Sequence, residues 1–315
     1  MGSPPIAKES LKFLNESDLF EVVAAVTQPD RPSGRGHKTH PTEVKKYCQQ
    51  ENIFCLSPEK SSHSDFITEF KKLEADFVLV TAFGQILPQK ILDLYPDRFI
   101  NVHASLLPRW RGAAPIQRAV MAGDQESGVC LQVMVKALDA GDLIGEVKTE
   151  IHPDESALSL HDRLQDLIPS LLKSFIAPYL NGEVEPQKQD PAQVTYASKI
   201  EKSESWIDWD LDAKQIYKNY LGLSLGPGVK SAMQDTSYKF KKIKFLKNQS
   251  PLEKTQTPGE IIEITEDSIK IACGKGAVEI LEIQKQSKKN MSVREFLKAP
   301  SFKLGDRFSF PPEVL

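Results

Sequence analysis

The stretch Phe77–His103, FVLVTAFGQILPQKILDLYPDRFINVH, decides the fold because it places two apolar runs on either side of a helical pattern. Residues 77–83 and 99–103 are rich in β-branched and aromatic side chains, which is typical of buried strands. Residues 87–94 between them have apolar side chains at helical spacing. A strand, a helix and a second strand in this order predict two parallel strands joined by a crossover helix.

The same alternation extends over the whole N-terminal part of the chain. Further strands are predicted at residues 21–28 and 128–135, and helices at residues 42–50, 61–73, 114–122 and 156–180. Strands that alternate with helices favour a parallel sheet covered on both faces. We therefore predict a doubly wound, Rossmann-like α/β domain over residues 1–182.

The beginning of the chain, Met-Gly-Ser-Pro-Pro, has the pattern of a turn that leads from a strand into a helix, but no strand precedes it. One interpretation is that the helix simply opens the domain. The other is that a short apolar strand ahead of Gly2 is missing because the start is misplaced. We expect the second, because the first strand of a doubly wound sheet has a hydrogen-bonded neighbour on each side.

The pattern changes after residue 180. Residues 181–193, NGEVEPQKQDPAQ, are polar and contain two prolines, so we predict a linker over residues 183–203. Short strand-like runs then follow at residues 238–246, 259–264, 268–272 and 277–283. Strands of this length and spacing predict a small, OB-like β-barrel domain over residues 204–315.

The composition excludes several classes of protein. The 315 residues are 40% hydrophobic and 26% charged, unlike collagen-like or wholly disordered chains. The longest apolar runs are far shorter than the roughly 18 residues of a membrane-spanning helix. The start shows no basic segment followed by an apolar one, as a secretory signal would. We therefore expect a cytoplasmic protein that enters no membrane.

The cysteines and histidines do not predict a metal site. The four cysteines contain no C-x-x-C pair, and the six histidines do not cluster with them. Zinc sites need such clusters, so we expect reduced thiols and no metal.

The segment Phe99–Gln117, FINVHASLLPRWRGAAPIQ, contains the candidate chemistry. Asn101 and His103 alternate along a strand, so their side chains lie on one face at the carboxyl edge of the sheet, where such sheets bind ligands. A lone histidine at a strand end is more often structural. Here, however, LDAGD at residues 138–142 places Asp139 in a turn after a later strand, and a carboxylate beside an imidazole orients it and stabilises its charge.

Several motifs together resemble the methionyl-tRNA formyltransferases, a family of the folate-dependent formyltransferases. They are TQPDRPSGRG at 27–36, FGQILP at 83–88, NVHASLLPRWRGAAPIQRA at 101–119, LDAGD at 138–142 and TYASKIEKSESWIDW at 195–209. The resemblance covers nearly the whole chain. It implies transfer of a formyl group from 10-formyltetrahydrofolate to the α-amino group of methionine on initiator tRNA, without a metal, for translation initiation.

The resemblance also implies roles for particular residues. Asn101, His103 and Asp139 would be catalytic: the amide and a protonated His103 donate to the developing oxyanion, and Asp139 supports His103 and organises proton removal. Folate would lie against the loops that follow the strands. The expected folate-binding residues are Phe83, Gly84, Ile86, Leu87, Pro88, Ser105, Leu106, Leu107, Pro108, Asp139, Gly141 and Asp142.

Two basic regions are candidates for binding tRNA. Residues 199–315 carry a net charge of +4 and residues 1–198 carry −7, which points to a polyanionic partner of the C-terminal part. The resemblance places the loop with Arg31, Arg35 and Lys38 at the acceptor end of tRNA, although composition alone favours a solvated loop. Lys239, Lys241 and Lys244 would hold phosphates, or else protect an edge strand from pairing.

The sequence departs from the family pattern at two places. Cys130 stands where relatives more often have a small hydroxyl residue, and residues 220–228, YLGLSLGPG, replace the usual turn before the barrel.

Two alternative functions stay open. A sugar-nucleotide N-formyltransferase would share the N-terminal half, but would need neither the basic loop nor the basic barrel. A non-catalytic RNA-binding protein would not need all three polar residues. We expect a monomer that uses initiator methionyl-tRNA and 10-formyltetrahydrofolate.

Overall fold

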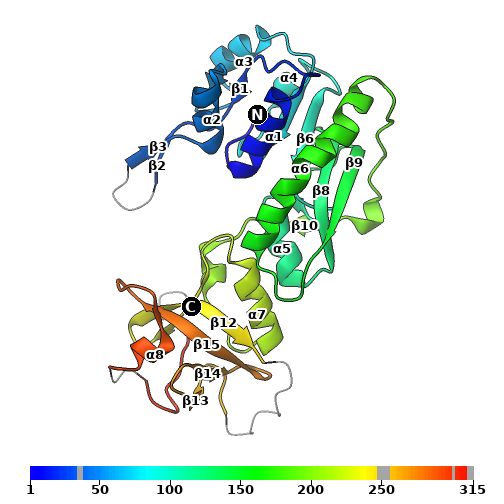
Figure 1. Ribbon diagram of the computed structural model, residues 1–315. Coiled ribbons are helices and arrows are strands. Elements are labelled where there is room, and N and C mark those ends of the chain that lie inside the picture. Colours follow the sequence, from blue (N-terminus) through cyan, green and yellow to red (C-terminus); the bar gives the residue numbers. More distant parts are fainter. Residues whose placement is uncertain (34–37, 247–255, 300–301, 311–315) are drawn as a thin grey trace. The chain divides into compact units, whose positions relative to one another are not determined.

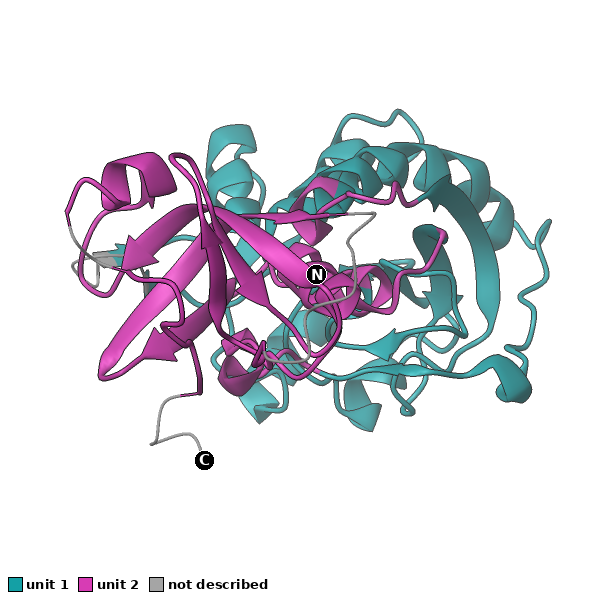
Figure 2. Ribbon diagram, turned by 90° about the horizontal axis from the view of Figure 1, so that it is seen from below, with its two compact units in different colours: residues 1–115, 126–150, 160–198 teal, residues 116–125, 151–159, 199–315 magenta. Residues whose placement is uncertain are grey.

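The computed structural model describes residues 1–33, 38–246, 256–299 and 302–310, and it divides into two compact units (Figures 1 and 2). Unit 1 consists of residues 1–115, 126–150 and 160–198, and unit 2 of residues 116–125, 151–159 and 199–315. Among the described residues, no helix is long and apolar enough to cross a membrane.

The main sheet of unit 1 has the strand order β5 (Val78–Thr81), β6 (Phe99–His103), β8 (Glu126–Val133) and β9 (Leu143–Glu150). Strands β5 and β6 are parallel, as the sequence predicts. Strands β8 and β9 run antiparallel to their neighbours, so the sheet is mixed rather than parallel. The reason is that the chain returns to the sheet at the edge where β6 ends, with His103 opposite Cys130.

Five helices of the described chain surround this sheet or connect to it. They are α1 (Pro5–Asn15), α2 (Glu43–Glu51), α3 (Ser64–Lys71), α4 (Gln89–Leu92) and α6 (Ala157–Leu180). Helix α5 (Pro115–Ala122) belongs to unit 2 except for its first residue. Figure 1 shows α6 running along β8 and β9. One face of this helix has apolar side chains at helical spacing that are fully buried, namely Leu160, Leu164, Ile168 and Leu171. A second cluster, centred on Phe70, Ile91 and Phe99, packs α3 and α4 against β5 and β6.

A smaller parallel pair, β1 (Ala25–Val26) and β4 (Cys55–Leu56), lies beside the main sheet. The first two residues of the chain lie between β1 and β5. The Gly2 N–H donates to the Val26 carbonyl at 2.9 Å, and the Thr81 N–H donates to the Met1 carbonyl at 2.9 Å. Of the predicted strand over residues 21–28, the structure has the two residues of β1 as a strand.

Unit 2 contains an antiparallel sheet with the strand order β11 (Val229–Met233), β12 (Thr236–Phe245), β15 (Ala277–Lys285), β14 (Ile269–Ala272) and β13 (Ile261–Ile264). The short strand β16 (Met291–Ser292) pairs with β15, and helices α7 (Ala213–Gly222) and α8 (Val293–Phe296) complete the unit. Residues 306–309 join the two edge strands: Ala232 donates to Ser309, and Ile261 donates to Asp306. The predicted OB-like domain is therefore an antiparallel sheet whose edges are bridged by this segment.

Phe308 lies at the centre of the core of unit 2, with no exposed surface. Its ring lies 5.3 Å from Phe240, 5.4 Å from Phe302 and 5.7 Å from Tyr238, all edge to face. Aromatic pairs in this arrangement stabilise a core beyond the area they bury. Phe308 therefore fixes the bridging segment to the sheet.

We expect Phe308→Ala to lower the free energy of unfolding of unit 2 by about 3–5 kcal/mol, because it removes a fully buried ring and leaves a cavity. Urea unfolding monitored by tryptophan fluorescence measures the change. Leu304→Ala is the matched control, because Leu304 in the same segment is 65% exposed. Similar losses in both variants would show that Phe308 does not hold the segment in place.

Candidate active site

Strand β6 places Asn101 and His103 on one face of the sheet, as its period of two requires. Both side chains are buried, with exposed fractions of 9% and 6%. Asn101 lies opposite Gln132 on β8, and His103 lies opposite Cys130. Burial raises the pKa of the Cys130 thiol to about 12, so the residue that departs from the family pattern is a neutral neighbour of His103.

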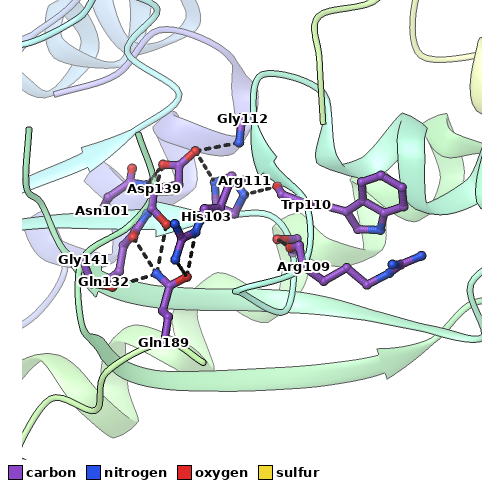
Figure 3. A network of polar contacts seen from close by, with 11 residues as sticks. Asn101, His103, Arg109, Trp110, Arg111, Gly112, Gln132, Asp139, Gly141 and Gln189 are labelled. Carbon is purple, nitrogen blue, oxygen red and sulfur yellow. Dashed lines mark hydrogen bonds and ion pairs between the residues drawn. The ribbon is translucent and has the colours of Figure 1, made fainter. Parts of the chain in front are cut away.

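The structure brings Asp139 to these two side chains (Figure 3). The Asn101 Nδ2 atom lies 3.5 Å from Asp139 Oδ1, and His103 Nδ1 lies 3.7 Å from Asp139 Oδ2. Asp139 has a φ of 47°, which is uncommon for a residue other than glycine. Position 141 requires glycine, because the chain there passes so close to β8 that a Cβ would lie 1.6 Å from the Val133 carbonyl oxygen.

Two further donors hold the Asp139 carboxylate, whose side chain is 13% exposed. Gln132 Nε2 donates to Oδ1 at 3.0 Å, and the Gly112 backbone N–H donates to Oδ2 at 2.8 Å. Hydrogen bonds to an ionised carboxylate offset the cost of burying it. The carboxylate is therefore fixed in place beside His103.

The other ring nitrogen of His103 is also engaged. His103 Nε2 lies 2.9 Å from the Trp110 carbonyl oxygen. Trp110 has a φ of 65°, its N–H donates to Thr195 Oγ1 at 2.9 Å, and the Arg109 guanidinium lies 4.4 Å from the centre of its ring. Both ring nitrogens thus face oxygen atoms, and the Trp110 carbonyl is the one at hydrogen-bond distance.

Gln189, in the predicted linker, is a residue that sequence reasoning missed. Its side chain is 8% exposed, and its Nε2 donates to the carbonyls of Asp139 at 2.9 Å and Gly141 at 2.7 Å (Figure 3). Arg111 donates to its Oε1 from two nitrogens, at 3.0 and 2.7 Å. The polar, proline-containing sequence around it resembles any surface connection, so no local signal marks Gln189.

The segment around Gln189 folds as part of unit 1. Strand β10 (Tyr196–Ala197) pairs in parallel with β7 (Arg111–Gly112), and Gln187 pairs with Leu143 at the start of β9. The loop that contributes the Gly112 donor is therefore held by a segment more than 80 residues further along the chain.

The structure distributes the predicted folate-binding residues between the core and the surface. Phe83, Leu87 and Leu107 are 3%, 7% and 4% exposed and pack inward, so their side chains do not form an open wall. Ile86 is 90% exposed. Ser105 is buried and donates to the Arg109 carbonyl at 2.7 Å. Gly84 is exposed, Gly141 is buried, and Leu106, Pro108 and Asp142 are half-buried. Folate binding by this segment stays a prediction, with Ile86 as its most accessible apolar side chain.

The basic loop of the sequence is part of a hairpin, β2 (Arg31–Ser33) with β3 (Lys38–His40). Arg31 is exposed and forms an ion pair with Glu59 at 2.7 Å. Lys38 contributes backbone to β3. Arg35 lies outside the described residues, so its contact with tRNA stays a prediction.

The lysines of β12 lie on the surface of unit 2. Lys239, Lys241 and Lys244 are exposed, whereas Tyr238 and Phe240 are buried, as alternation along a strand predicts. A bulge shifts the register after Phe240, so Lys242 is exposed as well. Lys244 lies 3.9 Å from Glu279 and is partly neutralised.

Lys239 has a basic neighbour across the sheet. It lies opposite Lys230 on β11, whose Nζ lies 4.0 Å from the centre of the Trp206 ring. Burial, and then the charge of Lys239, lower the pKa of Lys230. Like charges directly opposite each other destabilise a sheet, so a nearby anion would offset the repulsion between these two lysines.

Comparison with known proteins agrees with this fold. Residues 1–176 match the family model "Formyl transferase", and residues 199–301 match "Formyl transferase, C-terminal domain". Both the N-terminal and the C-terminal segment of the chain therefore belong to the formyl transferase family.

Curated relatives narrow the family further. The chain is 44% identical to the methionyl-tRNA formyltransferase of Bdellovibrio bacteriovorus, over 98% of this chain and 96% of that protein. It is 40% identical to that of Citrifermentans bemidjiense, over 94% and 91%. The chain therefore belongs to the methionyl-tRNA formyltransferase family.

Solved structures support the fold. A sugar 3N-formyl transferase, WlaRD, matches with a TM-score of 0.63 and 20% identity over 91% of this chain and 97% of that chain. HypX from Aquifex aeolicus, solved with tetrahydrofolic acid, matches with a TM-score of 0.58 and 18% identity, over 92% of this chain and 51% of that chain.

We expect Gln189→Ala to lower the kcat of formyl transfer about 10- to 100-fold with little change in KM, because the Asp139 turn loses both of its backbone anchors. The Gly112 amide, which bonds Asp139, should also exchange its hydrogen faster. Steady-state kinetics and hydrogen exchange measure the two effects.

Gln193→Ala is the matched control for this prediction. Gln193 lies in the same segment but is exposed and bonds only the neighbouring Asp190 among the described residues. Equal kinetics for Gln189→Ala and Gln193→Ala would show that Gln189 does not position the turn.

Proposed function

We propose that Asn101, His103 and Asp139 perform the chemistry of this enzyme, which transfers a formyl group from 10-formyltetrahydrofolate to the α-amino group of methionine on initiator methionyl-tRNA. The observation that carries the proposal is the meeting of an amide, an imidazole and a carboxylate within 3.7 Å at the carboxyl end of β6. The reaction itself is identified by the family to which nearly the whole chain belongs.

Asn101 and His103 stabilise the charge that develops on the formyl oxygen. When the amine attacks the formyl carbon, that oxygen becomes an oxyanion, and N–H groups that donate to it lower the barrier. The carbonyl re-forms as the bond from the formyl carbon to N10 of the folate breaks, and tetrahydrofolate leaves. The Asn101 amide and the His103 ring offer such donors from one face of one strand. Because β6 is buried and paired on both sides, their spacing is fixed before substrate arrives.

Asp139 supports the positive charge on His103 and takes a proton from the α-ammonium group of the methionine, so that the neutral amine attacks. Its two oxygens face Asn101 and His103, and the Gln132 and Gly112 donors keep it oriented. A general base needs this combination of fixed position and reach to the proton it removes.

The residues at this edge fit a folate. Ile86 presents an exposed apolar side chain after β5, and the half-buried Asp142 lies in the turn that follows β8. A folate has an aromatic pterin with a polar edge, which requires one surface of each kind. We assign the apolar contact to Ile86 and the polar contacts to Gly141 and Asp142. When bound, the folate supplies the formyl group.

We assign tRNA binding to the basic hairpin of unit 1 and to the lysines of β12. Arg31, Lys239 and Lys241 are exposed, and cations on an exposed face attract a phosphate backbone without reading its sequence. Because methionyl-tRNA serves translation, we place the enzyme in the cytoplasm, where we expect it to act as a monomer.

Replacing any one of the three polar residues should slow the reaction. We expect Asn101→Ala, His103→Ala and Asp139→Ala each to lower kcat by about two orders of magnitude or more, because all three act on charge that develops in the transition state. Affinity for tetrahydrofolate, measured by calorimetry, should change by less than about tenfold. Near-normal turnover in one variant would remove that residue from the mechanism.

The double variant Lys239→Ala/Lys241→Ala should raise the KM for methionyl-tRNA about five- to tenfold, because two phosphate contacts are lost. The slope of log KM against log salt concentration should fall by about two, one for each contact. Folate affinity should not change. Lys270→Ala is the control, because Lys270 is a surface lysine of the same sheet already paired with Glu263. If the double variant behaved like this control, β12 would not contact tRNA.

A further inference from the structure

Unit 2 contains a pocket of about 330 Å³ that the mechanism described above does not use. Its walls come from α5, residues 203–208, α7, the start of β11 and Phe310. All of these lining residues belong to unit 2. A volume of this size lies within the range of pockets that hold small ligands.

Trp206 provides an aromatic wall of this pocket. It is half-buried, although its neighbours Ser205 and Ile207 are buried. The Trp206 N–H donates to the Ser203 carbonyl at 3.0 Å, and the Ile207 N–H donates to the Lys230 carbonyl at 2.9 Å. The indole is therefore held at a fixed place, where one part of it stays accessible.

The segment that precedes Trp206 is also fixed. It forms the short helix η2 (Lys202–Ser205), in which Glu201 and Glu204 make a capping box. Arg118 of α5 donates two hydrogen bonds to Glu204, at 2.5 and 2.9 Å, and they lower the pKa of this carboxyl group. Glu204 is therefore occupied as a structural ion pair, and the pocket is formed before any ligand enters.

Two polar side chains of the lining keep hydrogen-bonding capacity. Asn219 Oδ1 accepts from Gln215 at 2.9 Å, and one Asp208 oxygen accepts from the Asp210 N–H at 3.0 Å. The Asn219 amide nitrogen and the second Asp208 oxygen have no partner among the residues that the structure describes. The pocket thus offers a donor and an acceptor near an aromatic wall. A nucleobase has the complementary groups, because its edge carries donors and acceptors and its faces stack on aromatic rings.

Positive charge lies directly beside this wall. Lys230 Nζ lies 4.0 Å from the centre of the Trp206 ring, and Lys239 lies opposite Lys230 on the neighbouring strand. Within the described parts of the chain, neither lysine forms an ion pair with a carboxylate. In a nucleotide one ribose joins the base to its phosphate, so an aromatic wall next to two lysines matches both ends of the same ligand.

We propose that this pocket binds one unpaired nucleotide of the RNA substrate: its base stacks on Trp206, and its phosphate lies at Lys230 and Lys239. The proposal rests on the proposed function of β12 as a tRNA-binding surface, and it adds a base contact to the phosphate contacts. A base inside a duplex is stacked and paired, so it cannot enter the pocket. The site therefore distinguishes RNA with an unpaired nucleotide from a continuous duplex, which phosphate contacts alone do not do.

The test measures the binding of two labelled hexamers by fluorescence anisotropy. One is a hexamer of adenosine, and the other has the same backbone with tetrahydrofuran in place of each base. We expect the wild-type chain to bind the adenosine hexamer about tenfold more tightly. Trp206→Ala should abolish this difference, Trp206→Phe should keep most of it, and Lys239→Ala should weaken both hexamers by the same factor.

The enzyme's own substrate gives a second measurement. Trp206→Ala should raise the KM for methionyl-tRNA about three- to tenfold and leave kcat unchanged, because the pocket binds RNA without touching the reacting atoms. Leu304→Ala is the control, since Leu304 is an exposed apolar side chain of unit 2 outside the pocket. If Trp206→Ala does not fold, as judged by its melting curve, Phe310→Ala removes the other aromatic side chain of the lining and is tested in the same way.

Equal affinity of the wild-type chain for the two hexamers would overturn the proposal, and so would an unchanged KM for methionyl-tRNA in Trp206→Ala. Free AMP is the competitor that separates a free nucleotide from a nucleotide of RNA. If AMP bound at least as tightly as the adenosine hexamer, the pocket would serve a free nucleotide and the proposal would be wrong. If Lys239→Ala bound both hexamers like the wild-type chain, the proposed function of β12 would fail and the pocket with it. Equal hexamer affinities that both fall in Lys239→Ala would overturn the pocket alone.

Discussion

The buried carboxylate of Asp139 is the interaction on which the site depends. A carboxylate at this depth is tolerated only if donors replace the water it loses, and each donor missing from such a group costs about 1–3 kcal/mol. The donors come from different strands: Asn101 from β6, Gln132 from β8 and the Gly112 N–H from β7. Assembly of the site and folding of unit 1 are therefore one event, because neither the carboxylate nor its partners are satisfied until all three strands are in place.

The same requirement explains why a polar segment follows α6. Gln189 satisfies the Asp139 and Gly141 carbonyls, which the left-handed turn leaves without partners in the sheet, and Arg111 satisfies Gln189 in return. A buried polar network of this kind is stable only when every member is satisfied. Arg111 and the Gly112 donor are neighbours on β7. This short strand therefore holds the Asp139 carboxylate directly, through Gly112, and the Asp139 backbone through Arg111 and Gln189.

Much of this arrangement could be predicted from the sequence, and the failures have physical causes. The period of two placed Asn101 and His103 on one face, and the LDAGD turn marked Asp139, because both signals are local. The direction of β8 was not predicted, since it depends on the edge at which the chain returns to the sheet. Gln189 was missed because its partners lie about 50 and 80 residues away in sequence, and a polar residue between prolines has no local mark of burial. The inward packing of Phe83 and Leu87 was also missed, because an apolar residue after a strand can line a pocket or the core.

The two sides of the main sheet differ in how firmly they are held, and this difference bears on the reaction. On the side of Asp139, β6, β8 and β9 pair without a break apart from one bulge, and α6 covers them. On the other side, β5 pairs with β6 but borders a cavity of about 240 Å³, and the loop with Ile86 follows directly from this strand. Stability within a protein is lowest where backbone pairing and apolar contacts are fewest. Asn101, His103 and Asp139 therefore lie on the more fully paired side of the sheet, whereas the loop assigned to folate follows β5, whose outer edge pairs with Met1 and Gly2 among the described residues.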